Sequence, residues 1–276
     1  MKMKVLIAGY GYLGGYLGEH FAKLGHEVSG IRRNWQTRPS AIQALTADLL
    51  EKKTLANLPQ VDAVIFCQAP SKESDSYENT YFKATQNLLA SLDKKIVKKI
   101  IFISSTSVYG KKDGSWVDES TVPETDDKET DWLLRAEQLV LKSGCPSVVL
   151  RLAGIYGPGR NRLKALKEGR LLPTFTEAHT NRIYVRDVVQ AVGLSLEKGT
   201  TGEVYVVADD APCTQKEFYT WLCKKLNLPH ESDAQPTTEN CHYRSNKRCR
   251  NTKIKALGLK LQYPSYKQGY LELINS

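Results

Sequence analysis

The sequence predicts a doubly wound α/β fold built on a parallel sheet, and three observations support this prediction. Short runs rich in β-branched and other apolar residues alternate with helical segments through the first half of the chain. Each connection between two of these runs is long enough to form a crossover helix, as consecutive parallel strands require. The composition is that of a globular protein, because 41% of the 276 residues are hydrophobic and 25% are charged.

The predicted elements follow one another in a regular order. The first strand covers 4–8, and the helix after it covers 12–24, with Leu13, Leu17 and Phe21 on one face. Further strands are predicted at 27–31, 41–47, 61–66, 99–104, 147–152 and 203–207. Further helices are predicted at 77–92, 131–142, 187–196 and 214–226. Thr214 is the expected N-cap of the last helix, since Glu217 follows it at the spacing of a capping box.

Composition and charge exclude several classes of protein. No stretch approaches the roughly 18 uncharged apolar residues of a membrane-spanning helix, and the apolar run 5–8 is too short for a signal peptide. The six cysteines form no C-x-x-C pair and lack metal-ligand spacing, so we expect free thiols, no metal site and a reducing cytoplasm. The net charge of +9 is compatible with nucleic acid, a membrane surface or a phosphorylated ligand.

The first strand leads directly into a glycine-rich loop that opens the first helix, Gly9-Tyr10-Gly11-Tyr12-Leu13-Gly14. This is the dinucleotide-binding pattern of the Rossmann fold in its proper strand–helix context. The first glycine is expected to form the tight turn, the second to let the backbone approach a pyrophosphate, and the third to let the helix pack on the strand. The helix N-terminus would then stabilise the phosphates.

The end of the second strand favours NADP over NAD. Arg32 and Arg33 stand there, and no acidic residue occurs between 28 and 47 to bind the ribose 2′-hydroxyl of NAD. Two guanidinium groups suit a 2′-phosphate, whereas surface capping of the strand is the alternative. Four further residues complete the expected cofactor site at the ends of the next strands, namely Asp48, Leu49, Gln68 and Ala69. Asp48 would meet the adenine amino group, with a helix N-cap as its alternative role.

Later segments of the chain resemble the extended short-chain dehydrogenases/reductases, the NAD-dependent epimerase/dehydratase family. The resemblance rests on blocks that occur in the family's order: 103–110 (ISSTSVYG), 135–138 (RAEQ), 155–159 (IYGPG), 182–188 (RIYVRDV) and 202–205 (GEVY). It implies a dinucleotide-binding domain over 1–152, to which 187–208 returns, and a smaller substrate lobe formed by 153–186 and 209–276. It also places Ser104 in the cofactor site.

The family's acid–base pair, Tyr-x-x-x-Lys, is absent at its expected position. Ser105 matches the family's Ser/Thr position, but counting back from Glu137 places Glu129 where the tyrosine belongs and Leu133 where the lysine belongs. Without the lysine, no tyrosine at that place would have a lowered pKa. The candidate catalytic groups are therefore Ser105, Glu129 and Tyr109, with the Asp118–Glu119 pair as a further source of carboxylates.

Three functions remain open. The chain is an enzyme with a substituted acid–base group, a cofactor-binding sensor or regulator on a reductase fold, or a nucleic-acid-binding protein. The last would use the basic stretch between 240 and 260, which contains no recognition-helix motif. A phosphorylated substrate would need the same positive charge, so we expect a small-molecule ligand and disfavour nucleic acid.

The resemblance assigns the substrate site to the edge between the sheet and the smaller lobe. Carried over by position, the expected substrate residues are Arg151, Tyr156 and Arg182, with Arg244, Lys247 and Arg248 supplying anion contacts. A buried ion pair with a helix carboxylate is the alternative for Arg151. In the resembling family two long helices pair into a four-helix bundle, so the segments 77–92 and 131–142 imply a homodimer. Whether the net reaction is epimerisation, dehydration or reduction stays open.

Overall fold

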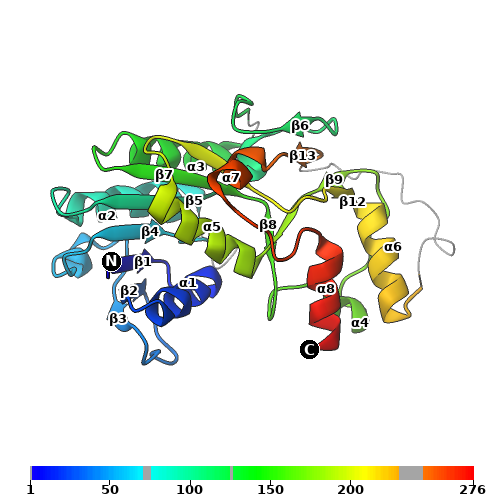
Figure 1. Ribbon diagram of the computed structural model, residues 1–276, viewed down its shortest axis with the longest axis horizontal. Coiled ribbons are helices and arrows are strands. Elements are labelled where there is room, and N and C mark those ends of the chain that lie inside the picture. Colours follow the sequence, from blue (N-terminus) through cyan, green and yellow to red (C-terminus); the bar gives the residue numbers. More distant parts are fainter. Residues whose placement is uncertain (1, 71–75, 125–126, 230–244) are drawn as a thin grey trace.

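The computed structural model describes residues 2–70, 76–124, 127–229 and 245–276. Seven parallel strands form the main sheet, in the order β11-β7-β5-β4-β1-β2-β3 (Figure 1). Their bounds are β1 Lys4–Ala8, β2 Glu27–Arg32, β3 Gln43–Thr46, β4 Ala63–Phe66, β5 Lys99–Ser105, β7 Ser147–Leu152 and β11 Val204–Val207. Strands β1 to β3 are added towards one edge of the sheet, and from β4 onwards strands are added on the other side of β1. This strand order is that of a doubly wound sheet, so the predicted fold class is confirmed.

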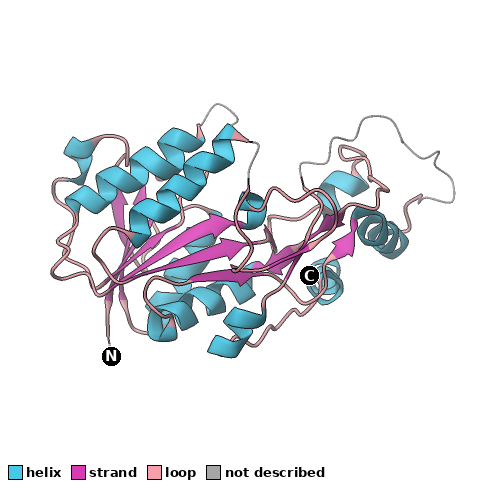
Figure 2. Ribbon diagram, turned by 90° about the horizontal axis from the view of Figure 1, so that it is seen from above, coloured by secondary structure: helices cyan, strands magenta, loops and turns pink. Residues whose placement is uncertain are grey.

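Helices cover both faces of this sheet (Figure 2). One face carries α1 Tyr12–Lys23 and α5 Val185–Lys198, which pack on each other, and the other carries α2 Ala84–Ser91 and α3 Lys128–Leu141. The central strands β1, β4 and β7 are buried along almost their whole length, which explains their continuous apolar sequence. Their side chains form the core between the two helical layers.

Two helices differ in detail from the sequence prediction. The predicted helix over 77–92 begins as one wide π-helical turn, η2 Glu78–Lys83, before it continues as α2. The helix predicted to begin at 131 begins at Lys128, because the Asp127 carboxylate accepts a hydrogen bond from the Glu129 N–H and caps it there. An aspartate N-cap with two acidic residues in the first turn is a start signal that the apolar pattern alone did not reveal.

The smaller lobe is built from short elements. Three two-stranded pairs connect its loops, namely β8 Gly154–Tyr156 with β10 Arg182–Tyr184, β9 His179–Thr180 with β12 Cys213–Thr214, and β6 Trp116–Val117 with β13 Arg248–Cys249. Its helices are α4 Leu163–Lys167, α6 Gln215–Leu226 and α8 Tyr266–Asn275, whereas α7 Thr252–Leu257 packs against β11 of the main sheet and against α5. The predicted Thr214–Glu217 capping box is present at the start of α6. Short 3₁₀ turns, η1 Lys52–Leu55 and η3 Thr106–Val108, complete the described elements.

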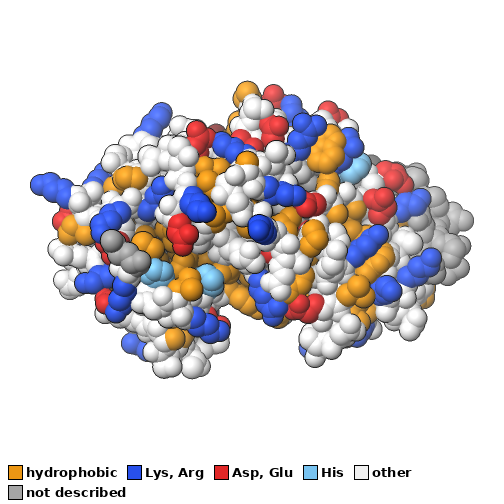
Figure 3. Space-filling view, in the orientation of Figure 1, with side chains coloured by type: hydrophobic (Ala, Val, Ile, Leu, Met, Phe, Trp, Pro, Cys, Tyr) orange, Lys and Arg blue, Asp and Glu red, His pale blue; other side chains and the backbone are white. Residues whose placement is uncertain are grey.

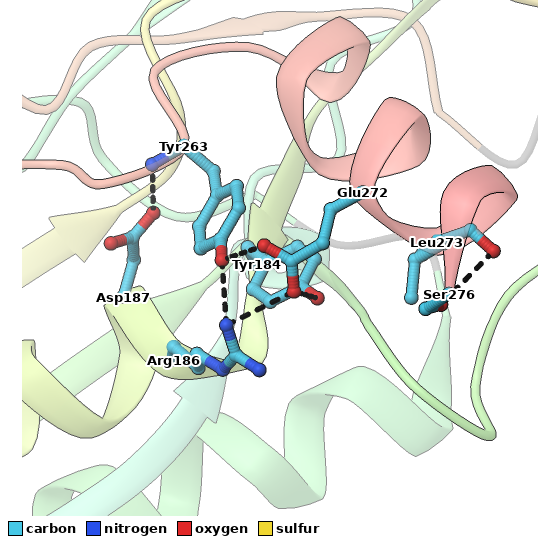
Figure 4. Close-up of polar contacts among 7 residues, drawn as sticks. All are labelled: Tyr184, Arg186, Asp187, Tyr263, Glu272, Leu273 and Ser276. Carbon is cyan, nitrogen blue, oxygen red and sulfur yellow. Dashed lines mark hydrogen bonds and ion pairs between the residues drawn. The ribbon is translucent and has the colours of Figure 1, made fainter.

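A polar cluster fastens the C-terminal helix α8 to the start of α5 (Figure 4). The Glu272 carboxylate accepts hydrogen bonds from the hydroxyls of Tyr184 and Tyr263, and Arg186 lies 3.0 Å from one of its oxygens. The rings of Tyr184 and Tyr263 stack with centroids 3.8 Å apart. Asp187 accepts hydrogen bonds from the backbone N–H of Tyr263 and of the residue before it. These contacts set the place of α8 beside the sheet.

Candidate functional site

The glycine loop has the geometry that dinucleotide binding requires. Gly9 has a φ of +90°, and a Cβ there would lie 2.5 Å from the Gln68 backbone, so the turn admits only glycine. A Cβ at Gly14 would lie 2.7 Å from the Gly9 carbonyl oxygen, which shows how closely helix and strand approach. Gly11, at the N-cap of α1, has no atom within 4 Å of its Cβ position, so a ligand can approach the backbone there.

The two tyrosines of the loop face opposite ways. The Tyr10 side chain is buried, and a Cβ at Gly18 or Gly30 would collide with its ring, so only its backbone is available to a cofactor. Its ring also contacts Trp35 at a centroid distance of 5.2 Å. Tyr12 lies on the other side, with its ring 5.6 Å from the Arg160 guanidinium. Leu13 packs in the core.

The ends of β2 and β3 carry the residues predicted to choose the cofactor. Arg32 and Arg33 are exposed where β2 ends, next to the glycine loop in the parallel sheet. The Asp48 carboxylate accepts a hydrogen bond from the Leu50 N–H at 2.9 Å within a turn, and Glu51 rather than Asp48 is the N-cap residue of η1, so Asp48 does not have the alternative role of a helix N-cap. The Leu49 carbonyl accepts a hydrogen bond from the Asn87 side chain. Asp48 and Leu49 make these contacts while they remain at the edge of the sheet where we expect the adenine.

At the end of β4, the Gln68 side chain donates a hydrogen bond to the Thr85 hydroxyl at 3.0 Å. Its carbonyl oxygen is buried and has no hydrogen-bond partner among the described residues. Ala69, the next residue, is exposed. An unsatisfied buried acceptor beside Gly9 is a polar group that a ligand hydroxyl could satisfy.

Four predicted or neighbouring residues form one buried network behind β5. The Glu137 carboxylate accepts hydrogen bonds from the Ser104 hydroxyl at 2.5 Å and from the Arg151 guanidinium at 2.7 and 3.1 Å. Arg151 also donates to the Tyr109 hydroxyl at 2.9 Å. Burial raises the pKa of Tyr109 to about 12, so this phenol is a poor proton donor near neutral pH.

This network corrects the place of three sequence assignments. Arg151 is 5% exposed and its donors serve Glu137 and Tyr109, so it occupies the buried ion pair rather than a substrate contact. Tyr109 is fully buried, which leaves no room for a reacting group at its hydroxyl. Ser104 uses its hydroxyl inside the protein, so a contact to a cofactor would come from its backbone.

The other catalytic candidates lie at the carboxyl end of β5. The Ser105 hydroxyl accepts a hydrogen bond from the Ser107 N–H at 3.1 Å and stays half-buried. Glu129 is exposed in the first turn of α3, which packs against η3, whereas Leu133 is buried in the core. The Glu119 carboxylate accepts a hydrogen bond from the Val206 N–H in β11, on the side of the strand that faces away from β7.

A groove of about 600 Å³ is lined by residues between 154 and 182 and by Tyr270 of α8, all within the segments expected to form the substrate lobe. Three of its arginines, Arg160, Arg162 and Arg182, have no carboxylate partner among the described residues. The groove is also lined by Gly154, Tyr156, Asn161, Ala165, Arg170, Leu171, Thr180, Asn181 and Tyr270. Arginines that line a concave site without a direct ion pair are suited to bind an anion, although the Asp209 carboxyl lies close enough for the Arg182 charge to lower its pKa.

Arg182 is held in place by uncharged groups. Its guanidinium lies 3.6 Å from the Phe218 ring centroid and donates to the Cys213 sulfur at 3.3 Å. Tyr156, also predicted, is buried and stacks on Tyr270, and its hydroxyl donates to a backbone carbonyl. Tyr156 therefore shapes the groove wall, and Arg182 presents its charge to the groove.

The C-terminal basic residues separate into different environments. Lys247 is 3% exposed, its amine donates to the Ser245 hydroxyl, and burial lowers its pKa. Arg248 donates to the Gly114 carbonyl and lies over the Trp116 ring, so it is occupied outside the groove. Arg244 lies outside the described residues. On the face drawn in Figure 3, Lys and Arg side chains are interspersed with acidic ones over both lobes.

Sequence reasoning missed Arg160 and Tyr270 in the groove wall. The signal for Arg160 was the Pro158-Gly159 turn directly before it, since such a turn fixes the direction of the next side chain. Tyr270 lies 114 positions after Tyr156, on which it stacks (270 minus 156). No local pattern connects two residues that meet only through the tertiary fold.

Two further absences concern the described residues only. No helix among them is long and apolar enough to cross a membrane. Within the same part of the chain, no group of three or more histidine, cysteine, aspartate or glutamate side chains is arranged to hold a metal ion.

A doubly wound parallel sheet with a dinucleotide-binding loop after its first strand is typical of proteins that bind nucleotide cofactors. Residues 5–208 match the model of the NAD dependent epimerase/dehydratase family, and the chain belongs to this family. The family and its structural neighbours bind NAD(P) cofactors.

Individual relatives agree with this assignment. The chain is 29% identical to Protein YeeZ of Escherichia coli K12 over 241 residues, which cover 82% of this chain and 84% of that protein. A solved structure from Methylobacillus flagellatus, described among the NAD-dependent epimerase/dehydratases, is 31% identical with a TM-score of 0.85 and covers 100% and 98% of the two chains. The dTDP-glucose 4,6-dehydratase of Streptomyces venezuelae, solved with NAD, shares the fold at 18% identity, a TM-score of 0.85 and coverage of 99% and 96%.

Proposed function

We propose that this protein is an NADP(H)-dependent oxidoreductase of the epimerase/dehydratase type that acts on a small phosphate-bearing substrate such as a nucleotide sugar. The observation that supports this most directly is the groove with Arg160, Arg162 and Arg182, none of which has a carboxylate partner among the described residues. The groove lies in the part of the chain that the family resemblance assigns to the substrate lobe.

The chain's own residues fit a dinucleotide. The open Cβ position at Gly11 and the N-terminus of α1 would receive its pyrophosphate, and Arg32 with Arg33 would receive a 2′-phosphate. Gln68 and Ala69 would border the ribose, and Asp48 with Leu49 the adenine. When bound, this group would supply the hydride acceptor or donor.

The substrate would be held by its anionic part. Arg182 is pre-organised by Phe218 and Cys213, so little side-chain entropy is lost when it binds a phosphate. Arg162 lies 5.9 Å from the Tyr219 ring on the opposite side of the groove wall. The dTDP-glucose substrate in the name of the Streptomyces venezuelae dehydratase carries a diphosphate of the same kind.

Proton transfer would depend on Ser105 and Glu129. Ser105 would orient a substrate oxygen through its hydroxyl, and Glu129 would accept or donate the proton at its carboxylate. Both lie where the sheet meets α3, and Glu129 is exposed to a ligand rather than buried. The groove would select the substrate, and the substrate would determine whether the net reaction is epimerisation, dehydration or reduction.

A second candidate function is that of an NADP(H)-binding sensor or regulator. The observation that favours it is the pair Glu129 and Leu133 at the positions where the family resemblance expects tyrosine and lysine. A bound cofactor without a proton relay would report on the redox state of the pool rather than turn over a substrate.

One experiment separates these functions. Purified protein would be titrated with NADPH and with NADP, then with a panel of nucleotide sugars and inorganic pyrophosphate, while nicotinamide absorbance reports net redox change and product analysis reports epimerisation or dehydration, which return the hydride. Turnover with any member of the panel supports the enzyme. Tight NADPH binding without turnover supports the sensor, and failure to bind either pyrophosphate or nucleotide sugars contradicts the groove assignment.

The proposal also includes a homodimer in a reducing cytoplasm. The helices η2 and α3 pack together, and Phe82 contacts Trp132 between them at a centroid distance of 5.4 Å. Both rings stay partly exposed on one surface of the protein, which is typical of a helix pair that meets a second copy.

The proposed reducing compartment rests on the cysteines. The five described cysteines are all unpaired, which suits a reducing compartment; they are Cys67, Cys145, Cys213, Cys223 and Cys249.

A further inference from the structure

A tight turn over Gly157-Pro158-Gly159-Arg160 separates β8 from α4. The N–H of Gly157 donates to the Arg160 carbonyl and the N–H of Arg160 to the Gly157 carbonyl, both at 3.0 Å. Gly159 has a φ of +72°, and a proline followed by a glycine with positive φ is the signature of a type II turn. The turn therefore fixes the backbone from which the Arg160 side chain leaves.

This turn presses against the start of the glycine-loop helix. A Cβ at Gly157 would lie 2.8 Å from the Tyr12 hydroxyl and 2.7 Å from a methyl carbon of Val185. Only a residue without a side chain allows this approach between the turn, α1 and α5. The Asn161 side chain donates to the Gly157 carbonyl at 3.1 Å and holds the turn from the groove side.

Arg160 consequently stands between two ligand regions. Its guanidinium lies 5.6 Å from the ring centroid of Tyr12, in the first turn of α1, and its side chain also lines the groove. Burial raises the pKa of the Tyr12 and Tyr81 phenols, and the nearby Arg160 charge acts in the opposite direction at both. The charge is thus close to α1, to η2 and to the groove at once.

Resting on the proposed function, we infer that Arg160 binds both ligands, contacting the phosphates of the dinucleotide at α1 and the anionic part of the groove ligand. Two anions in neighbouring sites repel each other, and this repulsion is weakly screened where protein surrounds them. A cation between them offsets the repulsion. Arg160 would therefore allow cofactor and substrate to be held at the same time.

Two other arginines provide matched controls. Arg162 lines the same groove but lies over Tyr219, away from the glycine loop. Arg32 lies at the end of β2, near the glycine loop but outside the groove lining. Replacing Arg162 or Arg32 should weaken the binding of one ligand each, whereas replacing Arg160 should weaken the binding of both.

The test uses isothermal titration of the full chain with two probes, NADPH into free protein and inorganic pyrophosphate into NADPH-saturated protein. Arg160→Met should weaken both affinities by about tenfold or more, the loss expected for a charge-assisted hydrogen bond. Arg162→Met should weaken only pyrophosphate binding, and Arg32→Met only NADPH binding. Arg160→Lys, which keeps the charge, should lose less than Arg160→Met for both probes.

The contrary outcomes are distinct. If Arg160→Met weakens one probe and leaves the other unchanged, the dual role is wrong while the proposed function stands. If NADPH-saturated wild type binds no pyrophosphate, both the dual role and the groove assignment are wrong. Arg160 is exposed, so thermal unfolding of its variants should match wild type. Equal losses in all three methionine variants for both probes would indicate a general charge effect and overturn the inference.

Discussion

Arg151 and Glu137 form a two-point ion pair inside the protein, with side chains that are 6% and 1% exposed. The nitrogen–oxygen distances are 3.1 and 2.7 Å. Glu137 comes from α3 and Arg151 from β7, so the pair joins the helix to the sheet directly behind β5. Tyr109 accepts a further hydrogen bond from Arg151 and Ser104 donates one to Glu137, and burial keeps both charged groups away from a ligand.

Breaking this pair should strongly destabilise the fold. Glu137→Gln leaves the Arg151 charge buried without a counter-charge, and the free energy of unfolding should fall by about 3–5 kcal/mol. Urea denaturation measures this loss. Lys164→Ala, which removes an exposed ion pair with Glu168, is the control and should change stability by less than about 1 kcal/mol. Equal effects of the two substitutions would contradict the buried role.

Asp209 should make stability depend on pH. Burial raises its pKa to about 8, and one of its oxygens has no hydrogen-bond partner among the described residues. The folded state therefore binds a proton more tightly than the unfolded state, so stability is full below about pH 4 and falls as pH rises towards 8. Asp209→Asn cannot ionise, and its Tm minus that of wild type should increase from pH 5 to pH 9. A constant difference over this range would disprove the assignment.

Cofactor choice should depend on Arg32. NADPH should raise the Tm more than NADH at equal concentration, because only NADPH offers a 2′-phosphate to the guanidinium. A hundredfold excess over Kd corresponds to about 2.7 kcal/mol of stabilisation. Arg32→Asp should reverse the preference, since its carboxylate repels the phosphate and can bind a ribose hydroxyl. The two nucleotides differ only at this phosphate, so each serves as the control for the other.

The catalytic rate of variants should distinguish Ser105 and Glu129, which a ligand can reach, from Tyr109, which is buried. Ser105→Ala and Glu129→Gln should each lower kcat by about 10²–10⁴-fold if proton transfer passes through them. Tyr109→Phe should leave kcat near wild type but reduce stability by about 1–2 kcal/mol, because Arg151 loses an acceptor. The pH–rate profile should show a group that titrates on the acid side. Full activity in the first two variants would mean that the active site lies elsewhere.

The oligomeric state is open to a direct measurement. Light scattering at micromolar concentration should give the mass of two chains of 31.0 kDa. Trp132→Glu places a charge on the surface shared by η2 and α3 and should shift the protein towards monomer. Trp221→Glu, on α6 of the smaller lobe, is the matched control and should leave the mass unchanged. A monomer mass for wild type would refute the dimer.

Local patterns were sufficient to predict most of the fold. The strands of the main sheet are short apolar runs whose burial on both faces follows from their sequence, and Thr214 with Glu217 marked the start of α6. The two-residue strands of the smaller lobe were not predictable, because segments far apart in the chain set their pairing. Arg248 pairs with Trp116 in this way across more than 130 positions.

The sequence predicted the part of the candidate site whose geometry depends only on backbone conformation, which is the glycine loop. Gly9 forms the tight turn and Gly14 allows the close approach of helix and strand, as expected, while the Cβ position of Gly11 is open and its contact with a pyrophosphate stays a prediction. Side-chain direction was harder to predict: Tyr10 turns inward because Gly18 and Gly30 leave space for its ring. For Arg151, a buried ion pair with a helix carboxylate was the alternative from the sequence, and the structure identifies Glu137 on α3 as that carboxylate. In each case the deciding neighbour is on another element, which periodicity does not reveal.

The contact between Glu119 and β11 has a consequence for solubility. β11 is the outer strand of the sheet, and unpaired backbone groups on an outer strand invite strands of other molecules to join it. The outward N–H of Val206 is occupied by Glu119, and the outward carbonyl of Val204 accepts a hydrogen bond from Lys253 at 2.9 Å. Both side chains also place charge beside the strand. Two outward backbone groups of β11 are therefore occupied, and the charges beside them disfavour the pairing of this edge with a strand of another molecule.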